Sequence, residues 1–241
     1  MMNLPRGILA AVVVLAVGGV AIVGWWFANR GDAVDMLSSG DPAQQGRAVA
    51  NLSAAADTPA GLEQIAETLR QKDPAVACSG LRALAATVVP DKPLPPPAVK
   101  IAESAVQDKR PQVQVAAIQI LEASTPPAPE DPAVPNIVLK AFLAEKAPET
   151  RAAAANALGK FQHWDAMEGL VEALEDESVE VRSSAGMAIR SIVGLDYGFR
   201  AKAPLSQRQE AIARIRNGWR LQLIFHLDNV RRIREKRSSQ P

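Results

Sequence analysis

Small and aliphatic residues recur at helical spacing along most of the chain. The clearest case is residues 176–189 (DESVEVRSSAGMAI), where Ala185, Ala188 and Ile189 fall on one face of a helix. Similar segments precede it, and each ends in an aliphatic residue that serves as its anchor. The anchors are Leu52, Leu84, Leu121, Leu158 and Ile189, at steps of 32, 37, 37 and 31 residues. Such a period predicts a helical repeat.

A second amphipathic segment precedes each anchored helix after the first. These segments carry apolar residues three and four positions apart, and they span residues 61–70, 97–107, 132–143 and 164–174. Each helix start is marked by Asp or Thr followed by proline. Asp or Thr is the capping residue, and proline suits the first helical position. Those dipeptides begin at Asp41, Thr58, Asp73 and Asp131. One repeat unit is therefore predicted to be helix, turn, helix.

These units resemble the HEAT family, especially its short bacterial HEAT-like subclass, whose pattern runs Asp, hydrophobic residue, Arg, Ala and then Ala-Leu. The best match is carried by Asp176, Val181, Arg182, Ala185, Ala188 and Ile189. Residues 151–158 match well, whereas Gln114, Ala77 and Gln45 stand where Arg is expected. The resemblance covers residues 41–193. It implies an α-solenoid with a surface for binding partners.

We therefore expect an all-α protein with an α-solenoid of about four to five HEAT-like helix pairs. A single transmembrane helix would precede the solenoid, and a capping helix would follow it. The expected segments are an N-terminal flank 1–6, a transmembrane anchor 7–28, a linker 29–42, the repeats 43–193, a capping turn and helix 194–227, and a basic tail 228–241.

Residues 7–28 contain no charged side chain and are long enough to cross a hydrocarbon core of about 30 Å. Aromatic residues at positions 25–27 suit the membrane interface. A cleaved signal peptide is the alternative, but the run is too long for one and no small-x-small cleavage site precedes Asn29. Arg6 favours a single-pass topology with the N-terminus in the cytoplasm and the solenoid outside it.

The charge is divided unevenly along the chain. Residues 32–199 hold 14 Lys/Arg and 23 Asp/Glu, a net charge of −9, whereas residues 200–241 hold 11 and 3, a net charge of +8. An acidic array argues against a nucleic-acid partner. The basic tail is interpreted either as a solvated segment or as a contact for anionic lipid or an acidic partner. The contact residues would be Arg231, Arg232, Arg234, Lys236 and Arg237.

The capping helix is predicted from an apolar stripe after the last repeat. The stripe consists of Ile212, Ile215, Trp219 and Leu223. Because the terminal unit of a stacked array exposes an apolar face, this stripe is expected to cover that face.

The sequence shows no pattern typical of a catalytic or metal site. His163 and His226 lie far apart and have no partner at metal-ligand spacing, and the single Cys78 excludes a disulfide framework. There is no glycine-rich phosphate loop and no Gly-x-Ser-x-Gly turn. We expect no cofactor and no metal.

These features favour a membrane-anchored, non-catalytic scaffold that binds an unidentified protein. Contact residues are predicted two positions before four of the anchors, on the side of the second helices away from the small-residue stripe. They are Arg82, Gln119, Asn156 and Met187, with ordinary solvent exposure as the alternative interpretation. Arg151 and Arg182 are assigned to structure, as partners of carboxylates or helix ends.

Two other functions stay open. The phycobilin lyase-like group of HEAT proteins implies an enzyme or chaperone acting on a bilin, but only the repeat supports this resemblance. An envelope module that binds anionic lipid or polymer through its basic tail is the second.

Overall fold

The computed structural model describes residues 32–89, 94–126, 131–144 and 147–238, and these residues form eleven α-helices and two short 3-10 helices. They divide into two compact units. The N-terminal unit contains residues 32–88 and 94–101, and the C-terminal unit contains residue 89 and the described residues from 102 onward. The helix α6 (Pro96–Val106) supplies residues to both units.

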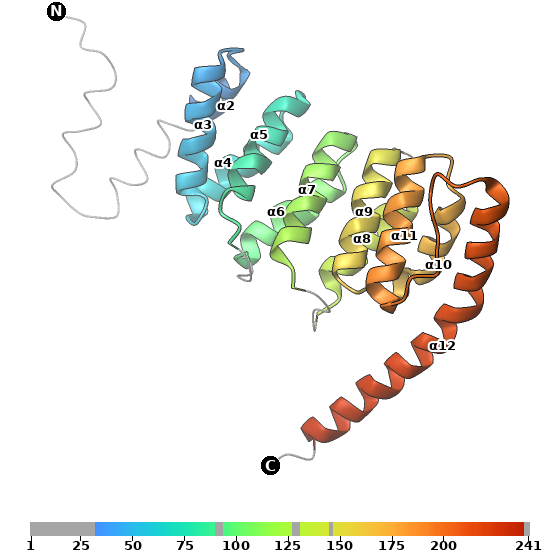
Figure 1. Ribbon diagram of the computed structural model, residues 1–241. Coiled ribbons are helices and arrows are strands. Elements are labelled where there is room, and N and C mark those ends of the chain that lie inside the picture. Colours follow the sequence, from blue (N-terminus) through green and yellow to red (C-terminus); the bar gives the residue numbers. More distant parts are fainter. Residues whose placement is uncertain (1–31, 90–93, 127–130, 145–146, 239–241) are drawn as a thin grey trace, which may run out of the picture. The chain divides into compact units, whose positions relative to one another are not determined.

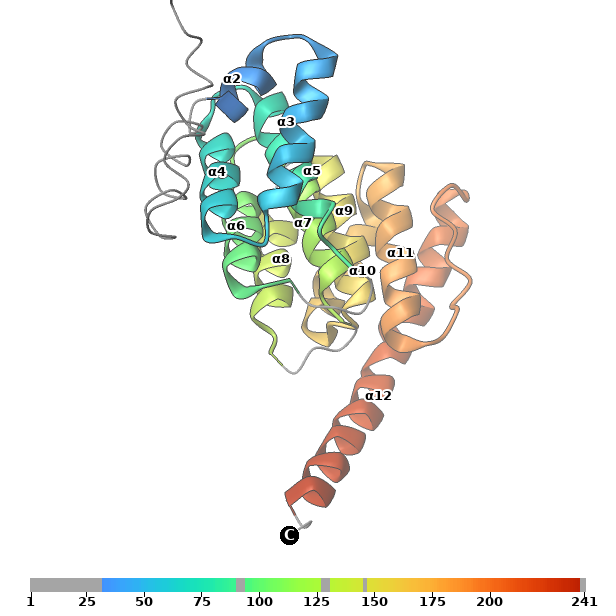
Figure 2. The same cartoon turned by 90° about the vertical axis from the view of Figure 1, so that its left-hand side faces the viewer.

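The N-terminal unit consists of α2 (Asp32–Ser38), α3 (Pro42–Ala55), α4 (Pro59–Arg70), α5 (Pro74–Ala85) and the start of α6. Consecutive helices pack against one another, α2 on α3 and α4 on α5, as Figure 1 and Figure 2 show. The predicted linker 29–42 is wrong in part, because α2 lies within it. Leu37 of α2 is buried, and its carbonyl accepts a hydrogen bond from Gln45 Nε2 at 3.1 Å, so tertiary packing stabilises this short helix.

The predicted helix starts are confirmed. The side chains of Asp41, Thr58 and Asp73 accept hydrogen bonds from backbone N–H groups in the first turns of α3, α4 and α5. Asp131 Oδ1 accepts a hydrogen bond at 2.9 Å from the N–H of Ala133, the first residue of α8. Each cap satisfies a donor that has no partner within its helix.

The C-terminal unit contains the end of α6, then α7 (Pro111–Ser124), α8 (Ala133–Ala144), α9 (Pro148–Lys160), α10 (Met167–Glu172), α11 (Val179–Val193) and α12 (Leu205–Ser238). The helix α9 is its centre, since α7, α8 and α11 all pack on it. The predicted helix 164–174 is interrupted. It consists of a 3-10 turn at Trp164–Ala166, the helix α10 and a second 3-10 turn at Ala173–Glu175.

All five predicted anchors lie in the core and are almost inaccessible to solvent. The stripe of small residues allows α9 and α11 to approach closely. A Cβ atom built on Gly159 would lie 2.6 Å from the Cα of Ala188, and Ser191 Oγ donates a hydrogen bond to the Gly159 carbonyl at 2.9 Å. The repeat pattern is therefore realised as direct contact between successive second helices.

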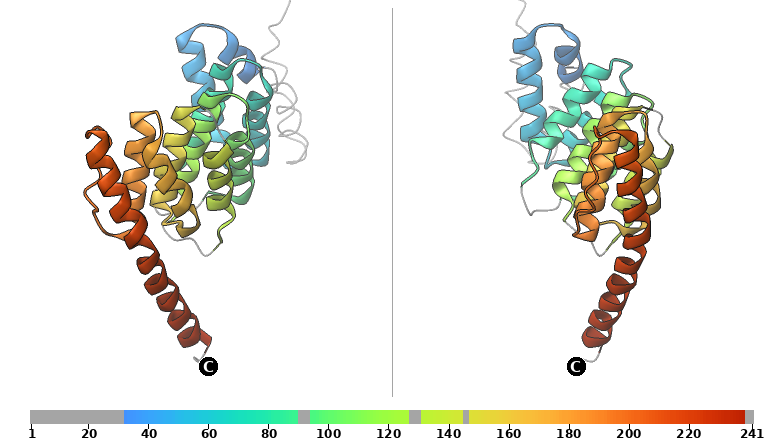
Figure 3. Two further views of the ribbon diagram at one scale, coloured as in Figure 1. Left: turned by 90° about the vertical axis from the view of Figure 1, so that its right-hand side faces the viewer. Right: turned by 45° about the vertical axis from the view of Figure 1, so that its right-hand side comes forward.

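The helix α12 has two different halves. Its first half packs on α10 and α11 through Ala211, Ile212, Ile215 and Trp219, which confirms the predicted cap. Its predicted end near Leu227 is wrong, because α12 continues to Ser238. The extension is rich in Arg, Lys and Glu, which favour helix. Figure 1 and Figure 3 show this second half leaving the packed helices of the unit.

The predicted anchor, residues 7–28, lies outside the described residues. Among the described helices, none combines the length and the apolar character needed to span a bilayer.

Candidate functional site

A hollow of about 300 Å³ lies beside α11 in the C-terminal unit. One wall is α11 itself, the other is the segment that connects α11 to α12, and Ile215 of α12 closes one side. We call it the α11 hollow. Its lining includes Gly186, Met187, Arg190, Leu195, Asp196 and Arg200.

Two glycines set the path of the connecting segment. Gly194 ends α11 in the left-handed conformation (φ 75°), and its N–H donates a hydrogen bond to the Arg190 carbonyl at 2.9 Å. Gly198 is also left-handed (φ 75°), and its N–H donates to Asp196 Oδ1 at 2.8 Å. Such φ values favour glycine at both positions.

The aromatic residues of the segment rest on two further glycines. A Cβ atom at Gly186 would lie 2.9 Å from the ring of Phe199, and one at Gly218 would lie 2.7 Å from the ring of Tyr197. The far end of the segment is held by Arg182, whose Nε and Nη2 donate to the Ala201 carbonyl at 3.2 and 3.1 Å. These contacts hold the connecting segment against α11 and so define the hollow.

The rim of the hollow carries one carboxylate between two guanidinium groups. Asp196 Oδ2 lies 3.7 Å from Arg190 Nη1 and 3.6 Å from Arg200 Nη2. The hydrogen bond from the Gly198 N–H, assisted by Arg200 and Arg190, lowers the pKa of Asp196 below its usual value. Asp196 therefore stays ionised at neutral pH, and the rim keeps one excess positive charge.

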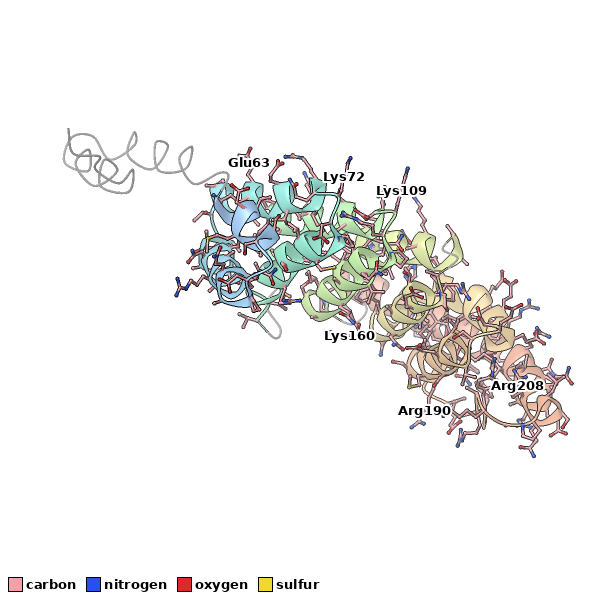
Figure 4. The ribbon with its side chains drawn as sticks, turned by 90° about the horizontal axis from the view of Figure 1, so that it is seen from above. Glu63, Lys72, Lys109, Lys160, Arg190 and Arg208 are labelled. Atoms are coloured by element: carbon pink, nitrogen blue, oxygen red, sulfur yellow. The ribbon has the colours of Figure 1, made fainter. Side chains whose placement is uncertain are left out.

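Both rim arginines are largely exposed, and Arg190 extends from the surface in Figure 4. Met187 and Leu195 present exposed apolar side chains in the same hollow. Apolar walls beside a positively charged rim suit a ligand in which an apolar side chain stands next to a carboxylate.

The helices that carry the hollow match a known family. Residues 135–211 match the family model described as HEAT repeats. The matched segment runs from α8 through α11 into the first part of α12. The resemblance is thereby confirmed for the last two helix pairs of the predicted array.

The structural roles predicted for Arg151 and Arg182 can be checked on the same helices. Arg151 pairs with Asp176, and Arg182 donates from Nη1 to the Asp176 carbonyl at 2.7 Å as well as to Ala201. Both arginines therefore have the structural roles that the sequence predicts.

Comparisons of this chain with solved structures and with curated proteins add no family assignment. A crystal structure of an engineered protein matches with 20% sequence identity and a TM-score of 0.44, covering 78% of this chain and 94% of the other. The search of curated proteins found no match.

The predicted contact residues Arg82, Gln119, Asn156 and Met187 are all exposed, on α5, α7, α9 and α11. Of these four, Met187 lines the α11 hollow. Partner binding by the four stays a prediction. The connecting segment was missed as part of a site, although its paired glycines and aromatics, Gly194–Phe199 in the sequence, were a visible signal.

The predicted contacts in the basic tail are only partly described. Arg232 pairs with Asp228 on the surface of α12. The side chains of Arg231, Arg234, Lys236 and Arg237 lie outside the described residues.

The two histidines, far apart in sequence, lie near each other in the C-terminal unit. Trp164 stacks on His226 with ring centroids 4.7 Å apart and planes 22° apart. His163 is 8% exposed, and its Nε2 has no hydrogen-bond partner among the described residues. No group of three metal-ligating side chains occurs in the described part of the chain. The stacking of Trp164 on His226 attaches α12 to the repeats.

Burial lowers the pKa of His163 below 6.5, with a weaker opposing effect from Asp165. The unfolded chain therefore binds more protons than the folded one once the pH falls below about 6.5. The buried, neutral His163 ring therefore contributes to the free energy of unfolding above pH 6.5. This contribution is lost as the pH falls from 6.5 toward the pKa of His163 in the folded protein, which is lower. We expect the urea midpoint of the C-terminal unit to decrease from about pH 7 to about pH 5.

The variant His163→Gln should show a smaller decrease over the same pH range, because glutamine does not titrate. Burial also lowers the pKa of His226, so the double variant with His226→Gln should respond least. Asp108 and Asp196, whose pKa values are lowered by hydrogen bonds from Arg110 and Gly198, titrate at more acidic pH. A pH response that is identical in the wild type and both variants would contradict the prediction.

Proposed function

We propose that this chain is a membrane-anchored, non-catalytic scaffold whose C-terminal HEAT repeats bind a segment of another protein. The α11 hollow is the observation that carries the proposal. It combines exposed apolar side chains, Met187 and Leu195, with two largely exposed arginines that share a single carboxylate. Arginine is one of the residue types enriched at the sites that dominate the energetics of protein interfaces.

A row of exposed residues leads to the hollow. Gln119, Asn156 and Met187 each stand two positions before a buried anchor, on α7, α9 and α11. Because α7 packs on α9 and α9 packs on α11, these residues occupy equivalent positions on successive neighbours. A partner segment that crosses the second helices would meet them in order and end at the hollow. Arg82 holds the same register on α5 of the N-terminal unit.

The chemistry of the rim indicates the kind of segment that fits. An aliphatic or aromatic side chain would enter between Met187 and Leu195. A neighbouring Asp or Glu would then replace Asp196 as the partner of Arg190 or Arg200. Guanidinium–carboxylate hydrogen bonds add orientation to the apolar contact. The expected ligand is therefore a short segment that places an apolar residue beside an acidic one.

The membrane part of the proposal rests on residues 7–28, which are uncharged and of spanning length. With the N-terminus in the cytoplasm, the repeats would hold their partner at the outer face of that membrane. The orientation is tested by protease treatment of intact and lysed cells, with the N-terminus of the chain followed on the same blot. Cleavage of the repeats only after the cytoplasmic membrane is opened would contradict this orientation.

The binding part is tested by selecting peptides from a displayed library on the full-length chain held in detergent. We expect the enriched sequences to pair an apolar residue with Asp or Glu. Arg190→Glu combined with Arg200→Glu should weaken binding of those peptides by at least about tenfold, since a like charge then faces the ligand carboxylate. Met187→Ser should weaken it through the lost apolar contact.

Reversal of two exposed charges elsewhere in the unit, Lys109→Glu and Lys140→Glu, is the matched control and should leave affinity nearly unchanged. Alanine at Gln119, Asn156 and Met187 together tests the row and should weaken binding without loss of helicity. Arg82→Ala tests the equivalent position of the N-terminal unit by itself. Selected peptides that bind the Arg190/Arg200 variant as tightly as the wild type would refute the assignment of the hollow.

A further inference from the structure

The second half of α12 carries large apolar side chains that no described part of the C-terminal unit covers. Leu221, Ile224 and Phe225 are 59%, 62% and 66% exposed. These three residues, which we call the outer stripe, are spaced three and four apart and lie on one face of the helix. Leu227, also exposed, lies at the edge of that face. Isolated exposed apolar residues are common, but a contiguous group indicates a contact surface.

The outer stripe faces away from the repeats. At about 100° per residue, its positions lie roughly opposite those of Ile212, Ile215 and Trp219, which are buried against the rest of the unit. The stacked pair of Trp164 and His226 attaches the inner face of the helix further along. The outer stripe is therefore available while α12 keeps its observed packing.

Basic residues flank the outer stripe. Arg220, directly before it, is 72% exposed and lies 3.9 Å from Glu168, and Arg232, two turns after Phe225, pairs with Asp228. The whole of α12 contains nine Lys/Arg and three Asp/Glu, a net charge of +6, whereas residues 32–199 have a net charge of −9. The helix thus combines an exposed apolar face with a strong local excess of positive charge.

Two other occupants fit these features less well. A coiled coil with a second copy requires apolar positions sustained over several heptads, but the face continues into Asp228, Arg231 and Arg232. Nucleic acid would use the arginines but leave Leu221, Ile224 and Phe225 in water, since protein contacts to single strands rely on stacking aromatics along a basic groove. An interfacial helix uses both features, with its apolar residues at the acyl boundary and its basic residues at the headgroups.

We propose that the second half of α12 lies on an anionic lipid surface, with Leu221, Ile224 and Phe225 inserted below the headgroups. The charged lipid attracts the arginines, and the apolar side chains supply the part of the affinity that salt does not screen. This contact does not depend on the α11 hollow, so the two proposals can fail separately. It would fix the repeats at the bilayer by a second point besides residues 7–28.

The test places an environment-sensitive fluorophore on the full-length chain at Leu221→Cys, in a Cys78→Ala background. The labelled chain is reconstituted with vesicles of phosphatidylcholine alone and with vesicles that contain phosphatidylglycerol. We expect a blue shift of the fluorophore with the anionic vesicles and little shift with the neutral ones, where residues 7–28 alone would hold the chain. High salt should reduce the shift.

Two sets of substitutions decide whether the outer stripe is responsible. Ile224→Ser with Phe225→Ser should remove most of the shift. The matched control, Val89→Ser with Leu143→Ser, removes two other exposed apolar side chains of the same unit and should keep it. Circular dichroism checks that helicity is unchanged.

An equal shift in both vesicles, no shift in either, or an equal shift in the two variants would overturn the proposal. A shift that grows with protein concentration in the absence of phosphatidylglycerol would overturn it in favour of a second copy of the chain. Peptide binding at the α11 hollow is measured separately, on the unlabelled chain in detergent, and its loss would leave this result untouched.

Discussion

Gly159→Ala is expected to destabilise the C-terminal unit by about 3 kcal/mol, toward the upper end of the cost of overpacking a core. The new Cβ would lie 2.6 Å from the Cα and 2.9 Å from the Cβ of Ala188. Since one of these atoms is backbone, no side-chain rotation relieves the contact. The helices α9 and α11 must separate, and the hydrogen bond from Ser191 Oγ to the Gly159 carbonyl must lengthen.

The measurement is urea unfolding of the full-length chain, with hydrogen exchange of peptides from α9 and α11 reporting on the C-terminal unit. Gly169→Ala, in α10 of the same unit, is the matched control. Its Cβ would lie 2.8 Å from the end of the exposed Leu143 side chain and 3.3 Å from the Phe142 ring. Both neighbours are side chains that can shift slightly, so we expect a change below about 1 kcal/mol. Equal effects of the two substitutions would show that the approach of α9 to α11 does not limit stability.

The close approach at Gly159 also shows why the repeat could be predicted from sequence. Small residues, anchors and capping dipeptides make contacts within one helix or between neighbouring helices of the repeat. Their spacing in the sequence therefore predicts where the helices begin, end and pack. The anchors Leu121, Leu158 and Ile189 are buried as expected for that reason. Arg151 and Arg182 could be assigned to structure because the same repeat places them near helix ends.

The features that the sequence did not predict depend on contacts with other parts of the chain. The helix α2 is short and is stabilised by packing of Leu37, a contact that no local pattern reveals. The α11 hollow requires Phe199 to lie on Gly186 and Tyr197 on Gly218, which are pairs set by how α12 folds back. The outer stripe of α12 was missed although Leu221, Ile224 and Phe225 lie within the predicted capping helix, because their exposure depends on where the repeats end beside α12.

Asp176→Ala is expected to cost about 2–3 kcal/mol, because it leaves a largely buried guanidinium without its main carboxylate. Arg151 donates from Nε to Oδ2 at 3.0 Å and from Nη2 to both carboxylate oxygens at 3.0 and 2.8 Å. The two side chains are only 21% and 13% exposed, so solvent screens the pair weakly. Asp176 Oδ1 also accepts the N–H of Ser178, the N-cap of α11. The substitution therefore weakens both the link between repeats and the start of a helix.

A double-mutant cycle separates these two effects. Asp176→Ala, Arg151→Met and the double variant are compared by urea unfolding, and we expect a coupling energy of about 1–2 kcal/mol between the two side chains. The remaining loss in Asp176→Ala belongs to the Ser178 turn. Arg232 and Asp228 on α12 are the matched control pair, 66% and 51% exposed, and their coupling should stay below about 0.5 kcal/mol. If the coupling energy between Arg151 and Asp176 were also below about 0.5 kcal/mol, apolar packing of α9 on α11 alone would join the last two repeats.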